Sequence, residues 1–198
     1  MKRILSIVAA YMILATNVIA LDFIEGGIYG GVGVGMEDYS SYSSIDAGYT
    51  FVLNGGKPIV KLGPGVLGAE GEFTYTMIPL TYGWSDCDLN IMTIGAYATY
   101  SYDFSDKFYA KAKLGIVNQD KDYDNCYSSS YYYEYYYDYY GYNYNYNSYS
   151  GDDGNSINVG AGIGLGFKLN SKLRLFTDFI VLDGSDLKQL NLGLQVSF

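Results

Sequence analysis

The stretch INVGAGIGLGFKL, residues 157–169, decides the fold class of this chain. Every second residue is apolar, from Ile157 through Ile163 to Leu169, and the residues between them are glycine, asparagine or lysine. Successive side chains of a strand point to opposite faces, so this alternation predicts a strand with one apolar face and one small, polar face. Because no helix follows, the glycines indicate the crowded inner face of a narrow barrel rather than a nucleotide-binding loop.

Seven other segments share this alternation and have about the length that a tilted transmembrane strand needs. They are residues 23–36, 45–53, 65–76, 90–102, 107–117, 173–181 and 190–198. Helical periodicity is not sustained anywhere after residue 20. We therefore predict an all-β fold, an eight-stranded antiparallel up-and-down transmembrane β-barrel over residues 21–198.

The connections between these segments alternate in length. Residues 103–106 and 170–172 form short turns, and a somewhat longer connection begins at residues 54–58. The intervening connections, residues 37–44, 77–89, 118–156 and 183–188, are longer or more variable. Short turns at the periplasmic end and long loops at the external end are typical of bacterial outer-membrane barrels.

The N-terminus has the features of a secretory signal peptide. Lys2 and Arg3 precede an apolar stretch, residues 4–20, that ends in Val18-Ile19-Ala20. We predict cleavage after Ala20, which makes residues 1–20 the signal peptide. The alternative is a membrane anchor, although the apolar stretch is shorter than the roughly 20 residues that a spanning helix needs.

Composition narrows the classes of function. The net charge is −9, and loss of the two signal-peptide bases takes it to −11, so binding to nucleic acid is not expected. Mean hydropathy near zero is too polar for a helical membrane protein but suits a barrel, in which every second strand residue faces lipid. The chain has no histidine, which is the usual general base or acid of outer-membrane enzymes. We expect neither enzymatic activity nor a cofactor.

Together, the signal peptide, the eight strands, the loop alternation and a terminal strand ending on Phe198 resemble the small outer-membrane β-barrels. These include the OmpX and Opa-type proteins and the barrel domain of OmpA. The resemblance implies an integral protein of the outer membrane of a Gram-negative bacterium, in contact with lipid and lipopolysaccharide. It also implies insertion by the outer-membrane assembly machinery, which reads such a C-terminal strand: Leu190, Leu192, Leu194, Val196 and Phe198. It implies no shared activity.

Charged residues on the inward faces are the best candidates for a chemical role. An eight-stranded barrel has an interior that side chains just fill, so we expect these charges to pair and to plug the lumen. Counted from the periplasmic turns, Glu70 and Glu72 fall at about the depth of Lys111 and Lys113. A narrow path for ions or protons is the alternative. The full predicted set is Glu25, Asp46, Glu70, Glu72, Lys111, Lys113, Lys168, Arg174 and Asp178.

The predicted third external loop is unusually rich in tyrosine. Residues 127–149 contain 13 tyrosines and no lysine, arginine or aliphatic residue. Tyrosine, serine, glycine and asparagine are favoured in binding loops, so the loop is a candidate contact surface for a host or neighbouring cell. A repetitive loop without a binding role is the alternative. The nearby acids lack a calcium-loop pattern, so no metal site is predicted. The candidate contact residues are Tyr131, Tyr132, Tyr133, Tyr135, Tyr136, Tyr137, Tyr139 and Tyr140.

Cys87 and Cys126 are the only cysteines, and both fall in predicted external loops. An even number of cysteines in an exported chain favours a disulfide between them. Two free thiols are the alternative. The sequence thus predicts a barrel that anchors a surface-interaction loop, an adhesion-type role, with a small passive porin-like pore as the alternative function.

Overall fold

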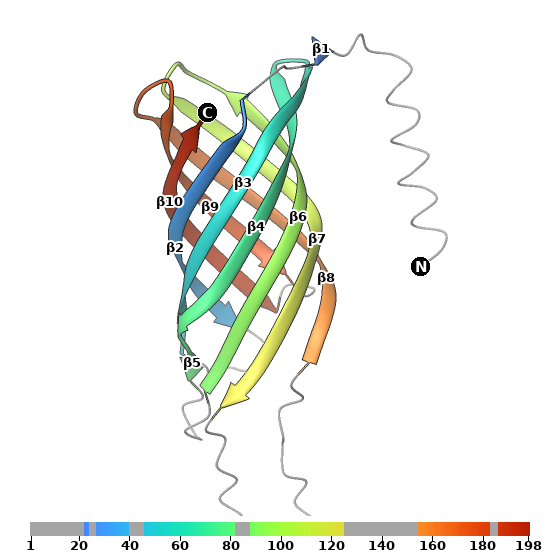
Figure 1. Cartoon of the computed structure of the whole chain (residues 1–198), viewed down its shortest axis with the longest axis vertical. Coiled ribbons are helices and arrows are strands. Elements are labelled where there is room, and N and C mark those ends of the chain that lie inside the picture. The colour runs from blue at the N-terminus through green and yellow to red at the C-terminus, as the bar shows by residue number, and fades with distance from the viewer. Residues whose placement is uncertain (1–21, 24–26, 40–45, 82–87, 125–153, 183–185) are drawn as a thin grey trace, which may run out of the picture.

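The computed structural model describes residues 22–23, 27–39, 46–81, 88–124, 154–182 and 186–198. Eight long antiparallel strands curl into a barrel (Figure 1), and two short strands, β1 (Asp22–Phe23) and β5 (Leu80–Thr81), lie at its ends. The long strands are β2 (Tyr29–Tyr39), β3 (Gly48–Leu62), β4 (Gly65–Ile78), β6 (Asp88–Asp103), β7 (Phe108–Asp124), β8 (Gly154–Lys168), β9 (Leu173–Leu182) and β10 (Leu187–Ser197). Within the described ranges, no helix is long and apolar enough to cross a membrane.

The barrel is closed by the terminal strand. β10 pairs with β9 on one side and with β2 on the other, over the whole length from Leu187↔Tyr39 to Ser197↔Tyr29. The outward residues of the two closing strands meet in register, with Leu192 opposite Val34 and Leu194 opposite Val32. The predicted fold class is therefore confirmed, including the closure that the alternation of residues 190–198 implied.

The predicted faces of the strands are also confirmed. Ile157, Val159 and Ile163 of β8 are 76%, 66% and 68% exposed on the outside, and the glycines between them face inward. Near the turn between β6 and β7, Phe108 packs against Phe104 and Phe167 with ring centroids 6.0 and 4.9 Å apart. Aromatic side chains at this level are typical of the girdle at a membrane interface.

The predicted connection at residues 54–58 is wrong. These residues continue β3 as far as Leu62, because they pair with β4 on one side and with β2 on the other, for example Gly56↔Glu70 and Gly56↔Tyr29. A register shift between Pro58 and Val60 accommodates the proline. The turn lies instead at Gly63, whose φ of 59° a residue with a side chain rarely adopts.

The predicted strand bounds change at the external end as well. β2 continues through Glu37 to Tyr39, and β7 continues through Asn118 to Asp124, so both strands enter segments predicted to be loops. At the other end, β2 begins at Tyr29, whereas the first strand was predicted from residue 23. Residues 1–20 and the whole tyrosine-rich segment, residues 127–149, lie outside the described residues.

Two layers of different character fill the interior. The periplasmic half, next to the short turns, contains charged and amide side chains. The external half contains a buried apolar cluster, which we call the apolar plug: Tyr39, Leu80, Leu89, Ile91, Tyr97, Val117, Ile180, Leu182 and Leu187. A few polar side chains, among them Glu37 and Gln189, are buried in the same half.

Candidate functional site

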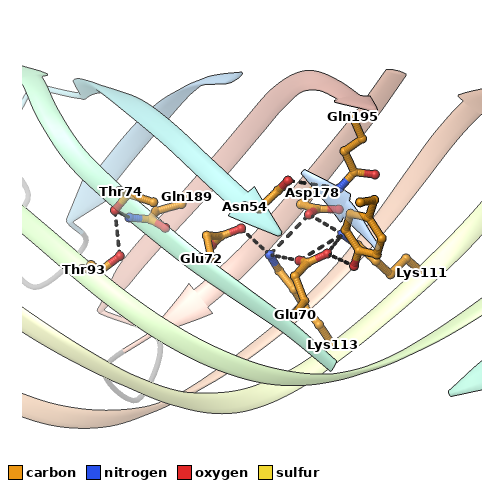
Figure 2. A network of polar contacts seen from close by, with 11 residues as sticks. Asn54, Glu70, Glu72, Thr74, Thr93, Lys111, Lys113, Asp178, Gln189 and Gln195 are labelled. Atoms are coloured by element: carbon orange, nitrogen blue, oxygen red, sulfur yellow. Dashed lines mark hydrogen bonds and ion pairs between the residues drawn. The ribbon is translucent and has the colours of Figure 1, made fainter. Parts of the chain in front are cut away.

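The charged centre of the interior is a five-residue ion-pair network. Lys111 and Lys113 project from β7, Glu70 and Glu72 from β4, and Asp178 from β9. Each residue is at most 6% exposed. Figure 2 shows the five side chains converging from the three strands.

The distances make this a compact network. Lys113 Nζ lies 2.7 Å from Glu72 Oε2, 3.3 Å from Asp178 Oδ2 and 3.5 Å from Glu70 Oε1. Lys111 Nζ lies 3.0 Å from Glu70 Oε2 and 2.9 Å from Asp178 Oδ2. Each lysine therefore bridges two strands that are not neighbours in the sheet, and the network braces the barrel across its lumen.

Aromatic and amide side chains complete the packing around the network. Tyr29 Oη donates to Glu70 at 2.6 Å, and the Lys113 ammonium lies 4.8 Å from the centre of the Tyr97 ring. Below these, the Tyr109 hydroxyl and Gln195 Oε1 are 3.3 Å apart, and Gln195 Nε2 donates to Asn54. Hydrogen-bond donors and aromatic rings thus contact Glu70 and Lys113 of the network.

The network could in principle offer metal ligands, since oxygen atoms of Glu70, Glu72 and Asp178 lie within 4.8 Å of one another. The two lysine ammonium groups already occupy the space between these carboxylates. Two cations against three carboxylates leave a net charge of −1. We assign the cluster a bracing role.

The other predicted lumen charges lie elsewhere. Lys168 pairs with Asp103 at the exposed periplasmic rim, and the Arg174 guanidinium lies 5.8 Å from the Tyr109 ring centre. Asp46 is exposed before β3, where its N–H donates to the Thr81 carbonyl, so it does not join the interior. Glu25 lies outside the described residues.

Sequence reasoning missed one buried charge. Glu37 was assigned to an external loop, yet it is fully buried inside β2. The alternation of Gly31, Gly33 and Gly35, all inward, leads directly to Glu37 and would have placed it on the same face. The remaining predicted residues, Cys87, Cys126 and the eight candidate contact tyrosines, lie outside the described residues.

The comparisons with known proteins agree with this architecture. No protein-family model and no curated protein matches the sequence. Among solved structures, Ail, the attachment invasion locus protein of Yersinia pestis, is 13% identical with a TM-score of 0.53, covering 88% of this chain and 100% of that chain. The N-terminal β-barrel domain of Pseudomonas aeruginosa OprF is 10% identical with a TM-score of 0.52, covering 88% and 100%.

The outer membrane protein OprG of Pseudomonas aeruginosa is 10% identical with a TM-score of 0.51, covering 87% of this chain and 96% of that chain. This chain has the fold of the small outer-membrane β-barrels. At identities this low, the likeness establishes the fold, and the function has to be argued from the residues of this chain.

Proposed function

We propose that this chain is an integral protein of the Gram-negative outer membrane, exported through residues 1–20, in which the barrel is a closed anchor and the external end is a contact surface. The filled interior is the observation that carries this proposal. The ion-pair network crosses one level of the lumen and the apolar plug crosses the next. A passive pore needs a continuous aqueous path, and these two layers leave no such path evident among the described residues.

The outer wall supports the anchor role. Large apolar side chains cover the outside of β8 and β10, with Ile157, Ile163 and Leu192 each more than half exposed. A soluble protein rarely exposes so continuous an apolar surface, whereas a lipid-facing barrel wall requires it. Asp38 of β2 and Lys188 of β10 pair in register beyond this apolar band, where the wall meets the external headgroups.

The contact surface begins on a stem formed by β6 and β7. Their pairing continues to Asp88↔Asp124, whereas the pairing of β4 with β6 ends at Tyr75↔Met92 and the short strand β5 pairs with the end of β6 at Thr81↔Asp88. Figure 1 shows β6 and β7 ending further from the C-terminus than β4 and β8 do. Residues 125–153 follow β7 in the sequence, and we propose that they form the rest of the contact surface.

The charge of this surface indicates the chemistry of the partner. Residues 118–156 contain seven acidic residues and one lysine, together with the tyrosines. On the described part of the stem, Asp120, Asp122 and Asp124 are exposed on one face of β7. We infer that the partner is a basic protein surface or a carbohydrate with hydroxyl groups that tyrosine and asparagine side chains can bind.

The Ail comparison sharpens this inference. One crystal structure of Ail, 15% identical with a TM-score of 0.52, holds the heparin analogue sucrose octasulfate. An acidic surface repels such a polyanion, so we do not extend that ligand to this chain.

The test is adhesion by a non-adherent Gram-negative strain that displays the barrel. We compare the full chain with a variant in which residues 127–149 are replaced by a short glycine-serine linker, and with the triple variant Asp120→Asn, Asp122→Asn, Asp124→Asn. We expect the loop deletion to abolish both autoaggregation and binding to epithelial cells. The triple variant should bind these cells more weakly, and the binding that remains should depend less on salt concentration. A matched control, Asp103→Asn with Asp106→Asn, changes carboxylates at the periplasmic end and should bind normally.

Surface labelling must show equal amounts of every variant. If the loop deletion binds as the full chain does, the contact surface is not in residues 127–149 and the proposal is wrong. Discrete single-channel openings of the purified barrel in planar bilayers would instead support the pore.

A further inference from the structure

Glu37 is a buried carboxylate with neutral partners. Its side chain is 0% exposed, Oε1 accepts from Gln189 Nε2 at 3.0 Å, and Oε2 lies 3.2 Å from the Thr76 hydroxyl. That hydroxyl is also 2.9 Å from the Ile91 carbonyl, and a single O–H hydrogen cannot serve both acceptors fully. The carboxylate is therefore weakly solvated by the protein, and burial of an uncompensated charge is strongly unfavourable.

No base of the chain compensates this charge. Outside residues 1–20, every lysine and arginine falls within the described ranges, and the chain has no histidine. None of these bases forms an ion pair with Glu37 in the described structure. Lys121, which contacts the same inward face, donates to Tyr39 Oη at 3.1 Å, with its ammonium 4.8 Å from the Tyr39 ring centre.

Unpartnered oxygen atoms surround the same place. Thr50 Oγ1, Gln189 Oε1 and both atoms of the Asn191 amide, Oδ1 and Nδ2, are buried, and none has a hydrogen-bond partner among the described residues. The strand pairing brings them together. Gln189 is in register with Glu37, while Asn191 and Thr50 flank Gly35, two residues before Glu37 on the same face.

Gly35 lets the side chains of Thr50 and Asn191 pack against its backbone. A Cβ at this position would collide with both Asn191 Oδ1 and Thr50 Oγ1, so the two oxygens converge on the bare glycine. Buried polar atoms without partners are rare in folded proteins and indicate a bound water or ion. A water molecule could satisfy some of these oxygens, but it would not supply the missing positive charge.

The donor set identifies the class of ion. It contains one carboxylate and three neutral oxygens, all hard ligands that suit alkali and alkaline-earth cations. Divalent cations commonly take several carboxylates, whereas one carboxylate matches a single positive charge. We propose that Glu37, Thr50, Gln189 and Asn191, the Glu37 site, bind one monovalent alkali cation inside the barrel.

The position of the site has a consequence for exchange. Tyr39 and Leu187 of the apolar plug come two residues after Glu37 and two before Gln189, toward the external end. Ile91 and Ile180 of the plug lie beside the site, since Ile91 bonds Thr76 and Ile180 is in register with Gln189. The ion-pair network lies on its periplasmic side. A cation in the Glu37 site is therefore enclosed when the barrel closes. We expect it to be acquired during folding and to exchange slowly afterwards, so that the cation stabilises the folded barrel as a ligand does.

To test this, the mature barrel is refolded in detergent micelles with NaCl, KCl or N-methyl-D-glucamine chloride at equal ionic strength and pH. Thermal unfolding is followed by far-UV circular dichroism and by the shift in gel mobility. We expect the midpoint of thermal unfolding to be several degrees higher in NaCl or KCl than in N-methyl-D-glucamine chloride. The organic cation is too large to enter the site. The increase should saturate with alkali concentration.

Two variants and a matched control show whether the dependence of stability on alkali cation arises at the Glu37 site. Glu37→Gln should abolish the difference between salts, because the neutral amide needs no cation. Asp38→Asn is the matched control, since it changes the neighbouring carboxylate, which is exposed, and should keep the full difference. Thr50→Val removes one oxygen at similar volume and should raise the alkali concentration for half-maximal stabilisation about tenfold or more.

The proposal is overturned if the wild-type midpoint is the same in all three salts, which would mean that water or a proton occupies the site. It is also overturned if Glu37→Gln retains the dependence on alkali cation. Should Glu37→Gln fail to refold, Thr50→Val and Asn191→Leu carry the same test, with a normal alkali dependence in both as the contradicting result.

Discussion

Replacement of Lys113 by methionine should strongly destabilise the barrel. The Lys113 side chain is buried, and its ammonium group contacts Glu70, Glu72 and Asp178 at 2.7 to 3.5 Å. Methionine fills a similar volume but carries no charge, so the three carboxylates would share only Lys111. Removal of one partner from a buried ion pair costs about 3–5 kcal/mol, because the remaining charge is left uncompensated.

The assay is urea-induced unfolding of the barrel in lipid vesicles, followed by far-UV circular dichroism. Lys172→Met is the matched control, since Lys172 is exposed in the turn between β8 and β9, and a surface substitution of this kind changes stability by less than about 0.5 kcal/mol. The double variant Lys113→Met, Glu72→Gln should lose less stability than the two single variants added together, by about 0.5–3 kcal/mol. A loss below about 1 kcal/mol for Lys113→Met, or strict additivity in the double variant, would refute the bracing role of the network.

Three other predictions follow from the packing of the interior. Planar bilayers containing the purified barrel should show no discrete conductance levels, because the ion-pair network and the apolar plug cross the lumen; stable openings would contradict this. Gly166→Ala should lower the free energy of unfolding by roughly 1–3 kcal/mol, since its Cβ would overlap the Tyr109 ring, whereas Gly71→Ala, whose Cβ would have no atom closer than 3.9 Å, should refold normally. Thr74→Val should cost about 1–3 kcal/mol because it leaves the Thr93 hydroxyl, 2.7 Å away, without its partner, and the double variant Thr74→Val, Thr93→Val should cost less than the sum of the two single variants in the same urea titration.

The fold could be predicted from the sequence because a membrane barrel makes its residue alternation unusually regular. In β8 every outward residue from Ile157 to Phe167 is apolar, and every inward residue is small or polar. Lipid outside and a narrow lumen inside impose opposite requirements on successive residues, so the period of two is visible without any knowledge of pairing. The central ion pairs followed from the same alternation, since Glu70, Glu72, Lys111 and Lys113 lie on inward positions.

The errors arose where local chemistry and long-range pairing disagree. Asn54-Gly55-Gly56-Lys57-Pro58 has the composition of a turn, and only its pairing with β2 and β4 keeps it extended. Glu37 was predicted to lie in a loop because the first strand was predicted to end at residue 36. Its neighbours Gln189 and Thr76 come from strands 152 and 39 residues away, so no local pattern could reveal that it is buried.

The apolar plug was missed for a different reason, and that reason bears on function. The interior was predicted to be filled by paired charges and glycines, and residues 183–188 were predicted to be a loop, so Ile91 and Leu187 were not named as interior residues. An apolar layer on the inside excludes water by the same burial that stabilises a soluble core, and it lies in the half of the barrel nearest the external loops. A barrel that transported solutes would have to open this layer at a large energetic cost, whereas an anchor benefits from it, because a rigid upper barrel fixes the β6–β7 stem. The distribution of apolar residues inside the wall therefore favours a protein that acts through the β6–β7 stem and residues 125–153.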